Sequence, residues 1–203
     1  MSRQYDYLTR AKCAGRGHAG PRGLKDTEAG GLAVQCLACP DPGRNMPEGW
    51  KDAPPAEVYK HALMLALDAN FRMKNCIRAN ELDDPSLGPG LGYFVFSDAY
   101  KEHLLKYVGK ADASTCIAFQ ALLQQETKLT TGLRVSGVGG CVCARHGYVR
   151  PLGLGDLQKG ERYANMDFIF MCAVDGSEVQ RIVISYDIAC QWQKRLRERV
   201  ALI

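Results

Sequence analysis

The sequence predicts a mixed α/β protein. Two apolar segments of strand length each run into an aspartate: Asp68 within residues 61–73, and Asp187 directly after residues 180–186. Between and after these segments, apolar residues recur at helical spacing, which is typical of helices that pack on a sheet. Side chains at strand ends line the functional edge of α/β sheets, so the two aspartates form the first candidate site.

The composition excludes several classes of protein. The chain has 203 residues, of which 46% are hydrophobic and 24% charged, enough for one domain with a buried core. Its unbroken apolar runs, such as residues 62–67, are far shorter than the about 20 residues that cross a bilayer, so no membrane association is expected. The net charge of +4 does not by itself indicate a nucleic-acid partner, although it is compatible with one.

Residues 1–60 are predicted to be an irregular segment ahead of the main domain. Residues 14–31 are rich in glycine and lack a periodic apolar pattern, which indicates coil. A tight turn with two cysteines and two prolines follows at residues 36–42, and then a proline pair at residues 54–55. We therefore place the beginning of the regular core at residue 61.

Residues 61–203 are predicted to form the core. The first apolar run stops abruptly at Asp68, which favours a strand, although its alanines and leucines also suit a helix. Residues 180–186 are short, apolar and rich in β-branched side chains, which predicts a second, buried strand. In chain order, we expect a strand over 61–73, a helical insertion over about 81–130 with helices at 100–108 and 115–129, a glycine-rich strand over 133–143, a helix over 156–173, a strand over 180–186 and a basic helix over 188–200.

Asp68 and Asp187 are candidate ligands of a hard divalent cation such as Mg²⁺. Carboxylates bind such ions through oxygen, and two ions held this way can activate a nucleophile and stabilise the leaving oxygen in phosphoryl transfer. The two aspartates are 119 residues apart, so the prediction requires the fold to bring them together. Asp156 and Asp167 are alternative ligands, although Asp156 is better placed as a helix N-cap.

The nine cysteines indicate a metal site rather than a disulfide framework. An odd number of cysteines, with no recognisable secretory signal, favours reduced thiols in the cytosol or nucleus. Cys36 and Cys39 form a CxxC motif, and Cys143 and His146 form a CxxH motif. Thiolate and imidazole are ligands that zinc prefers, so the two motifs together predict one tetrahedral Cys₃His site.

Several alternatives to this ligand set stay open. Cys141 could take the place of Cys143, and Cys13 with His18 could supply replacement ligands. Cys141 and Cys143 could also be ordinary residues of a strand, one of them simply buried, with no metal bound. Finally, Cys143 and His146 could act as a nucleophilic pair, although no orienting partner or oxyanion signal accompanies them.

Basic residues gather at both ends of the chain. Each group is either a solvated surface or a region that follows a DNA backbone. The N-terminal group comprises Arg3, Arg10, Lys12, Arg16, Arg22 and Lys25, and the C-terminal group comprises Lys194, Arg195, Arg197 and Arg199.

Five stretches carry a resemblance to a known family. They are CLACPDPGRNMPEGW (36–50), LALDANFRMK (65–74), CARH (143–146), GDLQKGERYANMDF (155–168) and SYDIACQW (185–192). Together they resemble the Kyakuja–Dileera–Zisupton (KDZ) transposases, which are abundant in mushroom-forming fungi. The resemblance extends from about residue 15 to residue 192.

The resemblance implies a cut-and-paste DNA transposase with an RNase H-like core. Its acidic triad, of the DDE type, would hold Mg²⁺ or Mn²⁺, and the first two acids correspond to Asp68 and Asp187. It also implies transposon-end DNA as the partner and a nuclear location, and it allows a homo-oligomer. The family's third acid lies well downstream of the SYDIACQW motif, so the core is expected to be truncated before that acid and strand transfer to be incomplete.

A different class of function is compatible with the same residues. The chain could be a non-catalytic, zinc-stabilised module derived from a transposon, which binds DNA or a protein through its basic ends. Metal-dependent DNA nicking that requires Asp68 and Asp187 would favour the catalytic hypothesis. DNA binding that survives their substitution, without cleavage, would favour the module.

Overall fold

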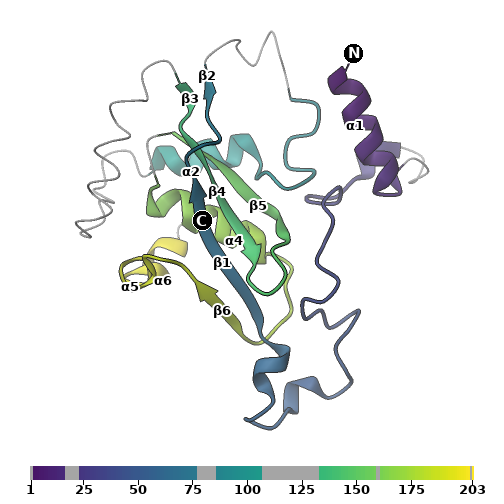
Figure 1. Cartoon of the computed structure of the whole chain (residues 1–203), viewed down its shortest axis with the longest axis vertical. Helices are drawn as coiled ribbons and strands as arrows, with labels where there is room; N and C mark the ends of the chain where they lie inside the picture. The colour runs from purple at the N-terminus through teal and green to yellow at the C-terminus, as the bar shows by residue number, and fades with distance from the viewer. Residues whose placement is uncertain (1, 17–22, 77–85, 107–132, 159–160, 202) are drawn as a thin grey trace.

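The computed structural model describes residues 2–16, 23–76, 86–106, 133–158, 161–201 and 203. These residues form a mixed α/β protein, which confirms the predicted fold class (Figure 1). The helix expected at residues 115–129 lies outside the described residues, as does most of the insertion expected at 81–130.

A four-stranded sheet forms the centre of the fold. Its strands are β1 (Leu63–Asn70), β4 (Gly137–Cys143), β5 (Val149–Leu157) and β6 (Ile182–Ser185), in the order β5-β4-β1-β6. Strand β4 pairs antiparallel with β1 on one side and with β5 on the other. Strand β6 lies on the other side of β1 and runs parallel to it. The chain therefore crosses over between β5 and β6, and the helix α4 lies in this connection.

Shorter elements surround this sheet (Figure 1). A two-stranded antiparallel sheet pairs β2 with β3. None of the described helices is long and apolar enough to cross a membrane. The remaining elements are α1 (Ser2–Cys13), η2 (Gly23–Asp26), η3 (Trp50–Asp52), η4 (Val58–His61), β2 (Asn75–Cys76), α2 (Ser97–Lys106), β3 (Leu133–Val135), α4 (Tyr163–Val174), α5 (Ala189–Trp192) and α6 (Leu196–Val200).

Helix α4 covers one face of the four-stranded sheet. Along β1, Leu63, Leu65 and Leu67 are buried in one core together with residues of α4, because alternate side chains of a strand point to the same face. Met64 and Ala66 are only half-buried and Asp68 is exposed. Alternation along β1 therefore puts the leucines on the α4 face and Asp68 on the opposite face.

Glycines let α4 approach the sheet closely. Gly139 of β4 pairs with Gly155 of β5. A Cβ at Gly139 would lie 2.9 Å from the side chains of Met166 and Ile169, and a Cβ at Gly155 would lie 2.8 Å from Ile169. Any larger side chain at these two positions would push the helix away from the sheet.

The structure differs from the predicted elements in several places. The single strand expected over 133–143 is divided into β3 and β4, which belong to different sheets, and β5 was not expected at all. Asp156 belongs to β5, where it pairs with Val138, so the helix expected at 156–173 begins only at Tyr163. The helix expected over 188–200 is interrupted at Arg195, whose φ of 58° lies in the left-handed region. The strand expected to be buried over 180–186 is β6, whose side chains alternate between half-buried and exposed because β6 is at the edge of the sheet.

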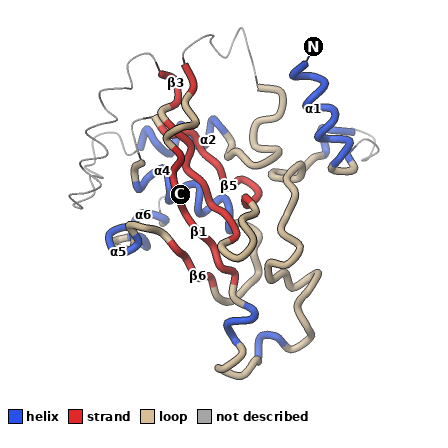
Figure 2. Tube along the Cα trace, viewed as in Figure 1, coloured by secondary structure: helices blue, strands red, loops and turns tan. Residues whose placement is uncertain are grey.

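The N-terminal segment follows the outer side of β5 before it reaches β1 (Figure 2). The backbone N–H of Leu32 donates to the carbonyl of Leu91 at 2.7 Å, and residues 92–95 in turn bond to β5. The segment is not irregular throughout, since α1 occupies Ser2–Cys13, a stretch without glycine or proline. The other described residues of the segment, apart from short 3₁₀ turns, are turns and coil.

Candidate metal centre

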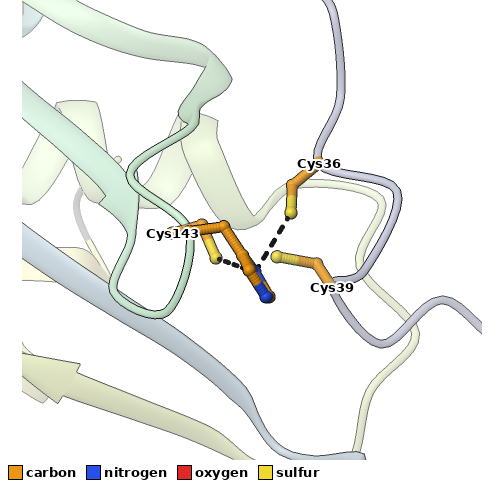
Figure 3. A group of neighbouring side chains, drawn as sticks. Cys36, Cys39 and Cys143 are labelled. Carbon is orange, nitrogen blue, oxygen red and sulfur yellow. Dashed lines mark hydrogen bonds between the residues drawn. The ribbon is translucent and has the colours of Figure 1, made fainter.

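Cys36, Cys39, Cys143 and His146 form one cluster, which we call the Cys₃His cluster. One ligand atom from each residue lies within 4.8 Å of those of the other three. The three cysteines point toward one another from two separate segments, the N-terminal coil and the end of β4 (Figure 3). Zinc–thiolate bonds of about 2.3 Å place the sulfurs of a tetrahedral site about 3.8 Å apart, so this spacing is compatible with zinc binding.

The imidazole lies between two of the thiols. His146 Nδ1 is 3.4 Å from Cys36 Sγ and also 3.4 Å from Cys143 Sγ. A nucleophilic pair needs one thiol next to its base, whereas here the nitrogen is shared equally between thiols from two segments. The geometry therefore favours a common ligand position over a Cys143–His146 catalytic pair.

The electrostatics of the thiols also suit a cation. Burial raises the pKa of the Cys39 thiol, and its neighbours Cys143 and Cys36 raise it further. Burial acts in the same direction on Cys36, but hydrogen bonds from the Ala38 backbone and from Cys39 outweigh it and lower the pKa of Cys36. Three buried thiols in one place cannot all ionise without a positive charge between them, and a metal ion supplies that charge.

Polar side chains of the CPDPGRN stretch hold the first pair of cysteines in place. The Asn45 side-chain amide donates to the carbonyls of Leu37 and Cys39, each at 2.8 Å. Arg44 donates to the carbonyl of Cys36 at 3.3 Å. Sequence reasoning did not single out Asn45, although asparagine after a Pro-Gly turn is a signal for such local capping.

A tight turn presents the second pair. Cys143 ends β4, its backbone N–H donates to the carbonyl of Tyr148, and its own carbonyl accepts from Gly147 N–H at 2.8 Å. Gly147 has a φ of 70°, a conformation that favours glycine. This turn brings His146 back toward Cys143, three residues earlier, so the CxxH spacing follows from the local backbone.

The structure also decides between Cys141 and Cys143. Both are buried in β4 and both pair with β1, Cys141 with Leu67 and Cys143 with Leu65, but only Cys143 belongs to the cluster. Burial raises the pKa of Cys141 to about 12, partly opposed by Arg150, so this thiol stays protonated. Cys13 is exposed in α1 and is not part of the cluster, and His18 lies outside the described residues.

Of the two candidate catalytic aspartates, Asp68 lies in β1, and Asp187 lies just beyond the end of the parallel strand β6. The last registered pair between β1 and β6 is Ala66 with Ser185. Asp68 follows Ala66 by two positions, and Asp187 follows Ser185 by two positions, beyond the last paired residue of β6. Both side chains are exposed, and each accepts a hydrogen bond from the next backbone N–H, at 2.7 Å for Asp68 and 2.8 Å for Asp187.

The alternative acidic ligands have other roles. Asp156 lies within β5 and is not a helix N-cap, which corrects that expectation. Asp167 is completely buried in α4 and accepts hydrogen bonds from Trp192 Nε1 at 2.8 Å and Arg199 Nε at 2.5 Å. Arg199 also lies over the Tyr163 ring, 5.0 Å from its centroid. Asp167 is therefore the acidic partner of a buried ion pair.

The fold and the site define a mixed α/β protein with a Cys₃His cluster, compatible with zinc binding, at one end of its sheet. The family model of the Kyakuja-Dileera-Zisupton transposases matches residues 61–202, and the chain belongs to that family. No curated protein and no solved structure matches it.

Proposed function

We propose that residues 61–203 are a portion of the RNase H-like catalytic domain of a DNA transposase. The family match supports a transposase, and the strand arrangement supports this type of core. Three antiparallel strands are followed by a helix and by a strand that lies parallel to the first, on its free side. Under this proposal the substrate is DNA at transposon ends, and the protein works in the nucleus.

The observation that carries the catalytic proposal is that Asp68 and Asp187 each lie two positions after the last registered pair of β1 and β6. Neighbouring strands lie about 4.8 Å apart, so residues at equal register can share one cation. Both carboxylates are exposed, and oxygen donors of this kind fit Mg²⁺ or Mn²⁺. Such ions, when bound, activate water and stabilise the leaving oxygen of a phosphodiester. The role of the two aspartates is to hold the ions at the sheet face opposite α4.

We further propose that the Cys₃His cluster holds a structural zinc ion. Four protein ligands close a tetrahedral site and leave no position for a substrate. The ion would tie the N-terminal coil to the end of β4. Cys143 lies three positions after Gly140, the partner of Asp68, so about 10 Å of strand separates the zinc site from the acids.

Nicking of supercoiled plasmid DNA in the presence of Mn²⁺ tests the catalytic proposal. We expect Asp68→Asn and Asp187→Asn each to reduce nicking by about 100-fold or more, because each removes a cation ligand. Asp52→Asn, at an exposed aspartate in η3, is the matched control and should nick like the unmodified chain. Equal nicking by all three variants would contradict the proposal.

A second candidate function is a zinc-stabilised DNA-binding module without catalysis. It is favoured by exposed cations close in sequence to Asp187, namely Lys194, Arg195 and Arg197. In that case DNA binding would weaken steeply with salt and would survive both aspartate substitutions, because phosphate contacts rather than metal would supply the affinity. Electrophoretic mobility shifts at two salt concentrations distinguish the two functions.

A further inference from the structure

Asp187 lies between two anchored residues. Tyr186 is 7% exposed and Ile188 is 6% exposed, whereas Asp187 is exposed. Strand β6 ends at Ser185, so the sheet's hydrogen-bond ladder does not extend to the aspartate. Other contacts must hold this backbone if Asp187 is to keep a fixed position beside Asp68.

The contact on the N-terminal side is a buried hydrogen bond. The Tyr186 hydroxyl donates to the carboxylate of Glu161, which is 7% exposed and lies two residues before α4. The hydroxyl is the donor of this hydrogen bond, and the buried carboxylate is its acceptor.

The contacts on the C-terminal side are made through Trp192. Its indole N–H donates to Asp167 of α4, and its ring packs edge-on against that of Tyr186, with centroids 5.7 Å apart. Arg199 completes this side, because it pairs with Asp167 and also donates to the carbonyl of Trp192 at 2.7 Å. The residues before and after Asp187 are thus tied both to the region of α4 and to each other.

We propose that Glu161 and Tyr186 are positioning residues for the cation site, and that neither is a metal ligand. This inference rests on the proposed function of Asp187. Metal-binding side chains must be held to within about 0.5 Å by the packing and hydrogen bonds of their neighbours. The Glu161–Tyr186 hydrogen bond supplies this restraint at the point where the β-ladder ends.

The test is the affinity of the full chain for Mn²⁺, measured by electron paramagnetic resonance at a temperature where every variant is folded by circular dichroism. We expect Tyr186→Phe to weaken Mn²⁺ binding by about 3- to 10-fold, the value of one buried hydrogen bond. Glu161→Gln keeps an oxygen acceptor for Tyr186 and should bind Mn²⁺ nearly as the unmodified chain does. Asp187→Asn should abolish this binding.

Tyr100→Phe is the matched control. Tyr100 is 4% exposed, and its hydroxyl accepts from Asn165 of α4 and donates to the Asp156 carbonyl, but it is not adjacent to Asp187. Its loss should leave Mn²⁺ affinity unchanged. An equal weakening by Tyr100→Phe and Tyr186→Phe would reveal a general effect of packing and overturn the inference.

The remaining outcomes separate this inference from the proposed function. If Asp187→Asn abolishes Mn²⁺ binding while Tyr186→Phe does not weaken it, only the positioning role is wrong. If Glu161→Gln abolishes binding as Asp187→Asn does, Glu161 is itself a ligand, and the inference is wrong for that reason. If Asp187→Asn binds Mn²⁺ as well as the unmodified chain, both the cation site and its positioning residues are rejected.

Discussion

Cys36 Sγ lies 3.4 Å from His146 Nδ1, although 110 positions separate the two residues in the sequence. This contact joins the N-terminal coil to the turn after β4, between two segments with few regular backbone bonds of their own. A cross-link that closes a loop of this length stabilises a fold by about 4–5 kcal/mol in the chain-entropy description. A metal ion in the Cys₃His cluster would therefore act chiefly on the stability of the N-terminal segment.

The first prediction concerns which thiols bind zinc. We expect the unmodified chain to contain one zinc ion, Cys143→Ala to contain none, and Cys141→Ala to retain it, as measured by elemental analysis after dialysis. The two cysteines are both buried in β4 and only two positions apart, but only Cys143 belongs to the cluster. The comparison therefore separates the loss of a zinc ligand from the loss of a buried side chain. Zinc loss in both variants would point to collapse of β4 rather than to a ligand role.

The second prediction concerns pH. Since burial and the neighbouring thiols raise the pKa of Cys39 in the metal-free chain, this thiol carries a proton at neutral pH, and zinc must displace it. Zinc affinity should therefore rise with pH, by at least about tenfold per pH unit between about pH 6 and pH 8. Competition with a chelator of known affinity measures this slope. A flat profile would mean that Cys39 is already a thiolate or is not a ligand.

The third prediction concerns the buried ion pair of Asp167 and Arg199. Asp167→Ala leaves the largely buried guanidinium and the Trp192 indole N–H without this partner, so we expect a loss of about 3–5 kcal/mol in the free energy of unfolding. Glu102→Ala, which removes the exposed pair with Lys106, should cost less than about 1 kcal/mol. Urea unfolding measures both.

A double-mutant cycle completes this test. The variant with alanine at both Asp167 and Arg199 should lose less stability than the sum of the two single losses, because no buried charge is left unpaired. Additive losses would show that the two side chains act independently.

The fourth prediction concerns the close approach of α4 to the sheet. Gly139→Ala should destabilise the fold by about 1–3 kcal/mol, because its methyl group would meet Met166 and Ile169 at 2.9 Å. Gly140→Ala should cost less than about 1 kcal/mol, since its nearest neighbour, a Leu154 methyl, is 3.4 Å away. Similar losses at both glycines in urea unfolding would contradict the proposed layer arrangement.

Much of the candidate metal centre could be predicted from short motifs. The CxxC and CxxH spacings are local, and thiol and imidazole chemistry names zinc without knowledge of the fold. The choice of Cys143 over Cys141 could not be predicted, because residues two apart on a strand share a face. Only the position of Cys143 at the end of β4, beside the turn to His146, separates them.

The beginning of one helix and the continuity of another could not be predicted from local periodicity. The apolar spacing over residues 156–173 predicts a single helix. In the structure, Asp156 instead pairs with Val138 and belongs to β5. Likewise, the apolar stripe of residues 188–200 suggests one helix, but the hydrogen bonds of Arg199 to the carbonyls of Trp192 and Lys194 stabilise a break at Arg195. In both cases long-range or side-chain bonds outweigh local propensity.

The sequence by itself determined the α/β class, the CxxC and CxxH motifs that supply the cluster and the two strand-associated aspartates, because these depend on local periodicity and on side-chain chemistry. Only the tertiary structure decided which residues from distant parts of the chain lie next to each other. It brought Cys36 to His146, set Asp68 and Asp187 each two positions beyond the last pair of β1 with β6, and buried Asp167 against Arg199. Such pairings depend on how the strands and helices pack, and no spacing along the chain encodes them.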